Sequence, residues 1–221
     1  MSLAKDIWAV VPVKKFDGAK QRLSGGLSPG HRAGLAAAMV ADVLGVLARC
    51  PGLSGVLVVT VEPVAIALAG ALGMRVTDAG ALDGHTGAVM GGMGVLRREG
   101  RAGMMTVPGD IPCIDVAEVE AVLAAHGVAP AFTIVPAHDD KGSNCIVCSP
   151  PGAVPLRFGD DSFFPHLAAA RHAGVEPLVV RAAGIGMDVD HPGDLEMALR
   201  GRVGARTLRF VRGTLGRYLE Q

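Results

Sequence analysis

The sequence is poor in aromatic residues, in net charge and in long apolar runs, and each shortage narrows the classes of protein it can belong to. Only 4% of the 221 residues are aromatic while 50% are hydrophobic, so the core must consist mainly of Ala, Val, Leu and Met. Lys plus Arg equal Asp plus Glu at 21 each, which argues against bulk binding of nucleic acid. No uninterrupted run approaches the ~18 apolar residues of a membrane span, and no signal peptide is recognisable at the start. We therefore expect a cytoplasmic protein without a membrane partner.

Cysteine is scarce as well, with four residues in the chain: Cys50, Cys113, Cys145 and Cys148. The CxxC spacing of Cys145 and Cys148 falls within SNCIVCS, a segment typical of a strand. Side chains three positions apart on a strand face opposite sides of the sheet, and no second pair completes a zinc site. We expect buried thiols here.

Strand-like apolar runs alternate with helical runs, the pattern of stacked βαβ units and a mainly parallel sheet flanked by helices. Strands are expected at 7–13, 55–60, 75–77, 103–107, 131–136, 143–149 and 177–180. Helices are expected at 29–49 behind an N-cap at Ser28, at 63–72, at 86–99, up to residue 126 behind an Asp115–Glu118 capping box, at 162–174 and at 191–200. We expect one α/β domain, residues 1–221. Its arginine-rich tail, 200–221, is expected to be solvated, with a dimer contact or part of an anion site as alternatives.

Four cations follow the first expected strand within nine residues: Lys14, Lys15, Lys20 and Arg22. Ligands of open α/β sheets bind beyond the carboxyl ends of the strands, so this loop lies where a ligand would be. The loop lacks both the GxxxxGK[ST] and the GxGxxG spacing, so side chains would hold the anion as much as backbone amides. The cluster favours a string of phosphates, with a solvated basic turn as the alternative.

Three aspartates are candidate metal ligands. Asp110 follows the fourth expected strand in VPGDIP, where it is either a turn residue or a ligand at the carboxyl edge of the sheet. Asp188 and Asp190 stand two apart in an extended segment and can converge on one point, as a Mg²⁺ site requires. Asp190 could also cap the helix that Pro192 helps to start.

Ser162 marks a third candidate site, because a helix that it caps would offer free amides to a phosphate, with capping alone as the alternative. A basic loop, an aspartate after a middle strand and a late Asp-x-Asp together are what metal-dependent nucleotidyl transfer requires. The cations and Mg²⁺ would neutralise a triphosphate and the charge that develops as pyrophosphate leaves.

Four segments in this order resemble motifs of the phospholactate guanylyltransferase family of coenzyme F-420 biosynthesis: VPVKKFDGAKQRL, VPGDIP, GSNCIVCSPPGAVPLRFGDDSF and GMDVDHPGDL. The resemblance spans about residues 7–199. It implies a fold similar to the glycosyltransferase-A-like nucleotidyltransferases. It also implies transfer of GMP from GTP to a small phosphorylated carboxylic acid, with release of pyrophosphate. Family acceptors are 2-phospho-L-lactate, phosphoenolpyruvate and 3-phospho-D-glycerate.

The resemblance assigns roles to residues of this chain. The resemblance implies that the carboxylates of Asp110, Asp188 and Asp190 bind Mg²⁺. Catalysis is implied for Lys14, Lys20, Arg22 and Asp110. Nucleotide binding is implied for Pro12, Val13, Lys14, Lys20, Thr86, Pro108 and Gly109. Acceptor binding is implied for Ser143, Asn144, Arg157, Gly159 and Ser162.

A catalytic histidine is not required, since a phosphate monoester is largely a dianion at pH 7 and can attack without a general base. His85, His138, His166, His172 and His191 are therefore expected to be structural or on the surface. The segment 84–88, GHTGA, departs from the family, whose members carry an asparagine there. Alternatives left open are a nucleotidyltransferase that uses CTP or ATP with a sugar or alditol phosphate, a metal-dependent glycosyltransferase, and a non-catalytic nucleotide-binding regulator.

Overall fold

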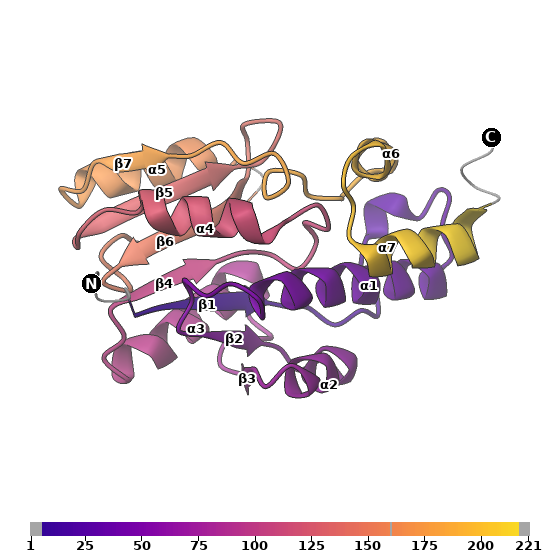
Figure 1. Ribbon diagram of the computed structural model, residues 1–221, viewed down its shortest axis with the longest axis horizontal. Helices are drawn as coiled ribbons and strands as arrows, with labels where there is room; N and C mark the ends of the chain where they lie inside the picture. Colours follow the sequence, from indigo (N-terminus) through magenta and orange to yellow (C-terminus); the bar gives the residue numbers. More distant parts are fainter. Residues whose placement is uncertain (1–5, 160, 217–221) are drawn as a thin grey trace.

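A computed structural model describes residues 6–159 and 161–216, and in this part of the chain helices cover both faces of a seven-stranded sheet (Figure 1). The strands are β1 (Ile7–Pro12), β2 (Gly55–Val59), β3 (Arg75–Thr77), β4 (Gly103–Thr106), β5 (Ala131–Pro136), β6 (Ser143–Ser149) and β7 (Pro177–Val179). They lie in the order β3-β2-β1-β4-β6-β5-β7. Every neighbouring pair is parallel except the two that β6 makes, with β4 and with β5. The expected mainly parallel sheet is confirmed.

The expected helices are present, with ends that differ by a few residues. They are α1 (Pro29–Leu47), α2 (Pro63–Ala71), α3 (Gly84–Arg98), α4 (Val116–Ala125), α5 (Phe163–His172) and α6 (Pro192–Arg200). A further helix, α7 (Ala205–Phe210), and the turn Val211–Leu215 follow in the tail. Ser28 caps α1 as predicted, because its hydroxyl accepts a hydrogen bond from the His31 N–H at 3.2 Å.

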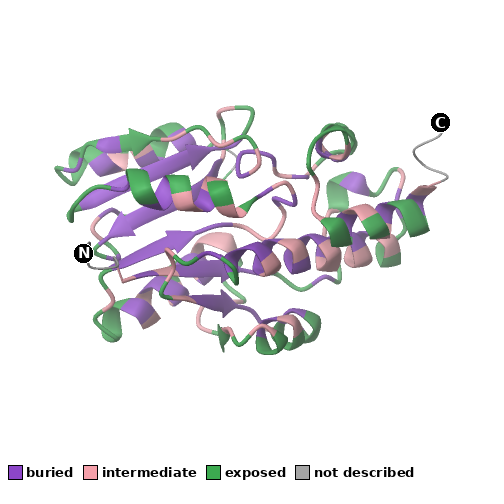
Figure 2. Ribbon diagram, in the orientation of Figure 1, coloured by how far each residue is buried: buried purple, intermediate pink, exposed green. Residues whose placement is uncertain are grey.

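Two apolar cores lie on opposite faces of the sheet, whose inner strands are buried while the edge strands β3 and β7 are largely exposed (Figure 2). Alternate residues of β1 divide between them: Val11 packs with α1, α2 and α4, whereas Val10 packs with α3 and α5. Cys145 and Cys148 fall in different cores as predicted, and both are buried free thiols. Burial raises the pKa of the Cys148 thiol, which keeps it protonated and unreactive.

Helix α1 has the length and mean hydropathy that a membrane span needs, at 19 residues and 1.2, contrary to the expectation that no segment comes close. About 56% of its apolar window is buried inside the structure, where it packs against β1 and α2. The helix also carries Arg32, whose guanidinium donates to the carbonyls of Ala19 and Leu27 at 3.2 and 2.7 Å. These features are those of the core helix of an α/β domain.

A third core joins the tail to α1, beside which α7 lies (Figure 1). Leu35 of α1 packs there with Val189, Leu195 and Val211. The carboxylate of Asp42 accepts hydrogen bonds from the Arg206 and Thr207 N–H groups at 3.0 and 2.8 Å. The tail is solvated on its charged face, since all its described arginines are exposed, and its apolar face packs on α1, which the prediction did not include; residues 217–221 lie outside the described part.

Candidate active site

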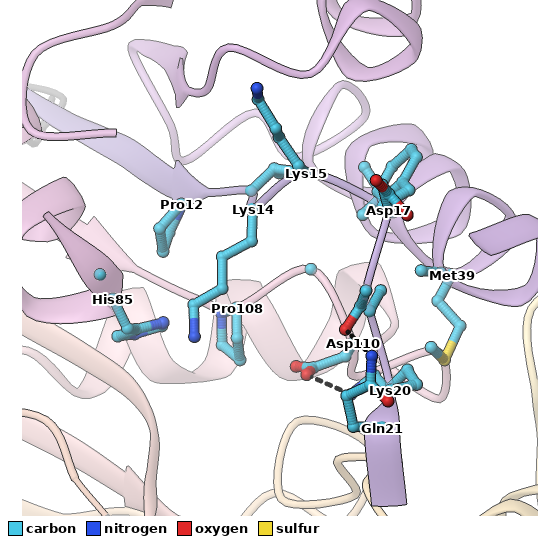
Figure 3. Close-up of a pocket in the computed structure, with 18 of the residues that line it drawn as sticks. Pro12, Lys14, Lys15, Asp17, Lys20, Gln21, Met39, His85, Pro108 and Asp110 are labelled. Carbon is cyan, nitrogen blue, oxygen red and sulfur yellow. Dashed lines mark hydrogen bonds and ion pairs between the residues drawn. The ribbon is translucent and has the colours of Figure 1, made fainter. Parts of the chain in front are cut away.

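A cavity of about 590 Å³ opens where β1 and β4 end, between their following loops and the start of α3 (Figure 3). Six of the seven predicted nucleotide-binding residues line it: Pro12, Val13, Lys14, Lys20, Pro108 and Gly109. Arg22, Asp110 and Asp190 line it as well. The carboxyl ends of parallel strands therefore bring the basic loop and two predicted metal ligands to one place.

Lys20 lies between two of the predicted metal ligands. Its Nζ is 2.6 Å from Oδ2 of Asp110 and 2.8 Å from Oδ1 of Asp190, and its side chain is only 9% exposed. Burial by itself lowers the pKa of Lys20, but the two carboxylates outweigh burial and the pKa is raised. The residue has φ 51° and ψ 46°, the left-handed conformation that a non-glycine residue rarely adopts. Lys20 thus places a largely buried ammonium, held in its charged form by two carboxylates, in the cavity.

The side chains of the other three cations in the loop after β1 point in different directions relative to the cavity. Arg22 Nη1 lies 3.2 Å from Oδ2 of Asp190. Burial opposes ionisation of Asp190, but the Lys20 charge beside it prevails and the pKa of Asp190 is lowered. Lys14 points into the cavity beside His85, whereas Lys15 points away from it (Figure 3). All four predicted cations therefore line the cavity, with the Lys15 side chain pointing away from it (Figure 3).

Asp188 and Asp190, expected to converge, have separate partners. Oδ1 of Asp188 accepts a hydrogen bond from Asn144 Nδ2 at 2.9 Å. Burial raises the pKa of Asp188, the Asn144 hydrogen bond opposes this, and the nearby Asp110 charge adds to it. Asp190 does not cap α6, because the N-cap is His191, whose N–H donates to the Asp194 carboxylate at 2.6 Å. The capping alternative is wrong, and the Asp190 carboxylate is used for Lys20 and Arg22 instead.

The segment that carries these aspartates is fixed from two sides. The Val189 N–H donates to the Asp110 carbonyl at 3.0 Å, so the two acidic loops are directly joined. The Glu118 carboxylate accepts from the Gly184 and Ile185 N–H groups, both at 2.8 Å. Asp115 caps α4 as predicted, accepting from the Glu118 N–H at 2.8 Å. The second half of that capping box is wrong, since the Glu118 carboxylate anchors the acidic segment.

No group of three or more His, Cys, Asp or Glu side chains within residues 6–159 and 161–216 is arranged to hold a metal ion. The reason is visible in the contacts: Lys20 supplies the positive charge between Asp110 and Asp190, while Asp188 faces Asn144. The predicted Mg²⁺ ligands are gathered at one edge of the sheet without forming a closed set.

The predicted acceptor-binding residues divide into buried and exposed members. Ser143, Asn144 and Ser162 are buried. The Ser162 hydroxyl donates to Ser143 Oγ at 3.1 Å rather than capping α5, so its predicted capping role is wrong. Arg157 and Gly159 are exposed in the loop between β6 and α5. Acceptor binding by these five residues stays a prediction, with Arg157 and Gly159 exposed and the other three bonded to neighbouring side chains or backbone.

Comparison with known proteins identifies the family to which this chain belongs. Residues 7–215 match the family described as guanylyl transferase CofC like. The chain belongs to the CofC-like guanylyl transferase family. It is 36% identical over 215 residues to the phosphoenolpyruvate guanylyltransferase of Conexibacter woesei, covering 96% of each chain. It is also 36% identical over 209 residues to the 2-phospho-L-lactate guanylyltransferase of Methanothermobacter thermautotrophicus, covering 92% of this chain and 91% of the other.

Solved structures agree on the fold of this guanylyl transferase. A structure described as a nucleotide-diphospho-sugar transferase from Desulfovibrio desulfuricans G20 superposes with a TM-score of 0.70 at 20% identity, covering 98% and 99% of the two chains. A nucleotidyl transferase from Methanothermobacter thermautotrophicus gives 0.61 at 20% identity, covering 95% and 99%. The glycosyltransferase-A-like nucleotidyltransferase fold implied by the motifs is confirmed.

Two residues of the guanylyl transferase have places that the sequence reasoning missed. His85, expected to be structural, lines the cavity, and burial lowers its pKa so that the ring is neutral. Thr86, expected at the nucleotide, is absent from the cavity lining, and its hydroxyl bonds to the backbone of Phe158 instead. The sequence feature that could have indicated both places is the segment 84–88 at the start of α3, where the chain departs from the family motif.

Proposed function

We propose that this guanylyl transferase moves GMP from GTP to the phosphate of phosphoenolpyruvate and releases pyrophosphate, as a cytoplasmic enzyme of coenzyme F-420 biosynthesis. The observation that carries the proposal is the cavity at the carboxyl edge of the sheet, where Lys14, Lys20 and Arg22 face one space. Relatives named phosphoenolpyruvate guanylyltransferase from Conexibacter woesei and Rubrobacter xylanophilus, 36% and 38% identical, favour this acceptor. 2-Phospho-L-lactate is the alternative, because a relative named for it is 36% identical.

The chemistry needs positioning and charge more than proton transfer. A phosphate oxygen of the acceptor attacks the α-phosphorus of GTP, and the bond from that phosphorus to the pyrophosphate oxygen breaks. Lys14, Lys20 and Arg22 would counter the charge of the triphosphate and of the departing pyrophosphate. No general base is required, because the acceptor phosphate is already largely a dianion at pH 7. Holding both substrates in line supplies much of the remaining rate.

The chemistry of the carboxylate donors suits a divalent cation, although the three aspartates do not form a closed ligand set in this structure. The Asp110 and Asp190 side chains are 32% and 40% exposed, and their carboxylate oxygens are the ligands that Mg²⁺ prefers. Asp188 is near enough to Asp110 for the Asp110 charge to raise its pKa, so it can serve as a third carboxylate ligand. We propose that these three aspartates hold Mg²⁺, which would neutralise phosphate oxygens. Lys20 must then share Asp110 and Asp190 with the ion or turn toward the nucleotide.

The test is pyrophosphate release by the purified protein with MgCl₂, across GTP, ATP, CTP and UTP and three acceptors. The acceptors are phosphoenolpyruvate, 2-phospho-L-lactate and 3-phospho-D-glycerate. We expect release with GTP and phosphoenolpyruvate, stopped by EDTA and restored by added MgCl₂. Release only with CTP or ATP would contradict the guanylyl assignment. GTP binding without turnover in any combination would favour a regulator.

A further inference from the structure

The loop between β6 and α5 presents Arg157 on a backbone that other elements hold in place. This inference rests on the proposed function and on the acceptor-binding role that the family resemblance implies for Arg157, whose side chain is exposed. The Phe158 N–H donates to Thr86 Oγ1 at 3.0 Å, and the same hydroxyl donates to the Phe158 carbonyl at 3.3 Å. The Arg157 N–H donates to His166 Nε2 at 3.0 Å. Side chains of α3 and α5 thus fix three backbone groups of two adjacent residues.

The α5 anchor is buried and neutral. His166 is 1% exposed, and burial lowers its pKa to about 4. Since Nε2 accepts from the Arg157 N–H, the ring proton must lie on Nδ1, which then donates to Ser143 Oγ at 2.9 Å. The Ser162 hydroxyl donates in turn to Ser143 Oγ, so His166 belongs to a buried chain of hydrogen bonds that fixes its ring.

The α3 anchor also touches the nucleotide cavity. The Phe158 ring lies edge-on between His85, at 4.6 Å between ring centroids, and His166, at 5.0 Å. His85 lines the cavity, while the next residue, Thr86, bonds to the loop. The first turn of α3 consequently contacts the nucleotide cavity with one side chain and the acceptor loop with the following one.

We propose that Thr86 is a positioning residue for the acceptor. Its hydroxyl fixes Phe158, and through Phe158 it fixes where Arg157 stands relative to the cavity. A hydroxyl that both accepts and donates is the only group of that size that satisfies the N–H and the carbonyl together. Thr86 therefore affects binding of the phosphoacid by positioning the loop of Arg157. Its neighbour His85, which lines the cavity, takes the place at the nucleotide that the sequence predicted for Thr86.

Three variants of Thr86 test the proposal. Thr86→Val keeps the shape but loses the hydroxyl, Thr86→Ser keeps the hydroxyl, and Thr86→Ala repeats the loss with a smaller side chain if valine perturbs folding. We expect Thr86→Val and Thr86→Ala to raise KM for the phosphoacid about tenfold, with KM for GTP within about twofold of the wild type. We expect Thr86→Ser to restore most of the acceptor KM.

Hydrogen–deuterium exchange of the free protein supplies a readout that is independent of turnover. The Phe158 amide should exchange about tenfold faster in Thr86→Val than in the wild type and in Thr86→Ser. An unchanged amide, or a raised KM for GTP in place of the acceptor, would overturn the proposal. Wild-type turnover, measured first, separates two failures. A wild type silent with every phosphoacid overturns the proposed function and this inference with it. An active wild type whose Thr86→Val form keeps its acceptor KM overturns this inference alone.

Discussion

Lys20 shows at the scale of single residues how the cavity is organised. One ammonium, 2.6 Å from Asp110 and 2.8 Å from Asp190, joins the loop after β1 to the loops after β4 and before α6. Because the group is largely buried, its attraction to both carboxylates is screened less than that of a surface pair. Lys20 can therefore both hold the free site together and supply positive charge to a triphosphate.

Lys20→Met should lower kcat/KM for GTP about 100-fold, because the variant loses the buried positive charge that faces the phosphates. Lys15→Met is the matched control, since Lys15 is a neighbouring lysine that points away from the cavity (Figure 3). We expect the control to lose at most about threefold. Steady-state kinetics of both variants check this, and equal losses would contradict the special place of Lys20.

Asp110→Asn should lower kcat at least about 100-fold, because an amide cannot replace the carboxylate that faces both Lys20 and the proposed Mg²⁺. The thermal midpoint should fall by only a few degrees, since Lys20 keeps its 2.8 Å ion pair with Asp190 and the variant stays folded. Glu176→Gln serves as a control, because it removes an exposed ion pair with Arg171 far from the cavity. Near-normal turnover in Asp110→Asn would rule out the assigned role.

At the scale of elements, side chains that join helices to loops decide the shape of the site. Glu118 of α4 holds the segment before Asp188 by two backbone hydrogen bonds of 2.8 Å. His166 of α5 holds the loop of Arg157, and Thr86 of α3 holds Phe158. The functional loops are therefore positioned by helices on both faces of the sheet.

His166 makes the stability of this junction depend on pH. Its folded-state pKa, about 4, lies below the ordinary 6.5, so the unfolded chain takes up the proton first as the pH falls. The contribution of the neutral ring is complete above about pH 6.5 and declines between about pH 6.5 and 4. Between pH 7 and 5 the free energy of unfolding should fall by about 2 kcal/mol more in the wild type than in His166→Asn. Urea unfolding at both pH values measures the difference, and parallel pH profiles would contradict it.

At the scale of the whole molecule, the third core ties the tail to the acidic segment. Leu35 of α1 and Val211 of the tail share this core with Val189, whose N–H bonds to the Asp110 carbonyl. The described part of the tail, residues 200–216, thereby packs behind the site, and none of these residues lines the cavity. A homodimer stays a prediction that light scattering would test.

Asp42→Ala should detach the start of α7, because the Arg206 and Thr207 N–H groups lose their carboxylate acceptor. We expect a loss of about 2 kcal/mol in the free energy of unfolding and faster amide exchange at both residues. Asp42→Asn keeps one acceptor oxygen and should lose less. Equal stability of the wild type and Asp42→Ala would show that apolar packing alone holds the tail.

Local sequence patterns identified residues whose side chains make structural hydrogen bonds, but they often gave the wrong partner for those bonds. Ser28 caps α1 as its position next to Pro29 indicated, since both partners lie within four residues. Glu118 and Ser162 have the local spacing of caps but bond to distant partners. A short window cannot detect Gly184, which lies 66 residues from Glu118 and whose N–H donates to the Glu118 carboxylate.

The sequence by itself determined the alternation of strands and helices, the mainly parallel sheet and the edge at which the functional loops meet. It could do so because side-chain periodicity is local, and because the carboxyl ends of parallel strands share one edge whatever their order. Only the tertiary structure decided that β6 runs antiparallel, that His85 enters the cavity, and that Lys20 joins Asp110 and Asp190. The physical reason is distance along the chain: these carboxylates lie 90 and 170 residues from Lys20, and their contact depends on how the whole sheet is ordered.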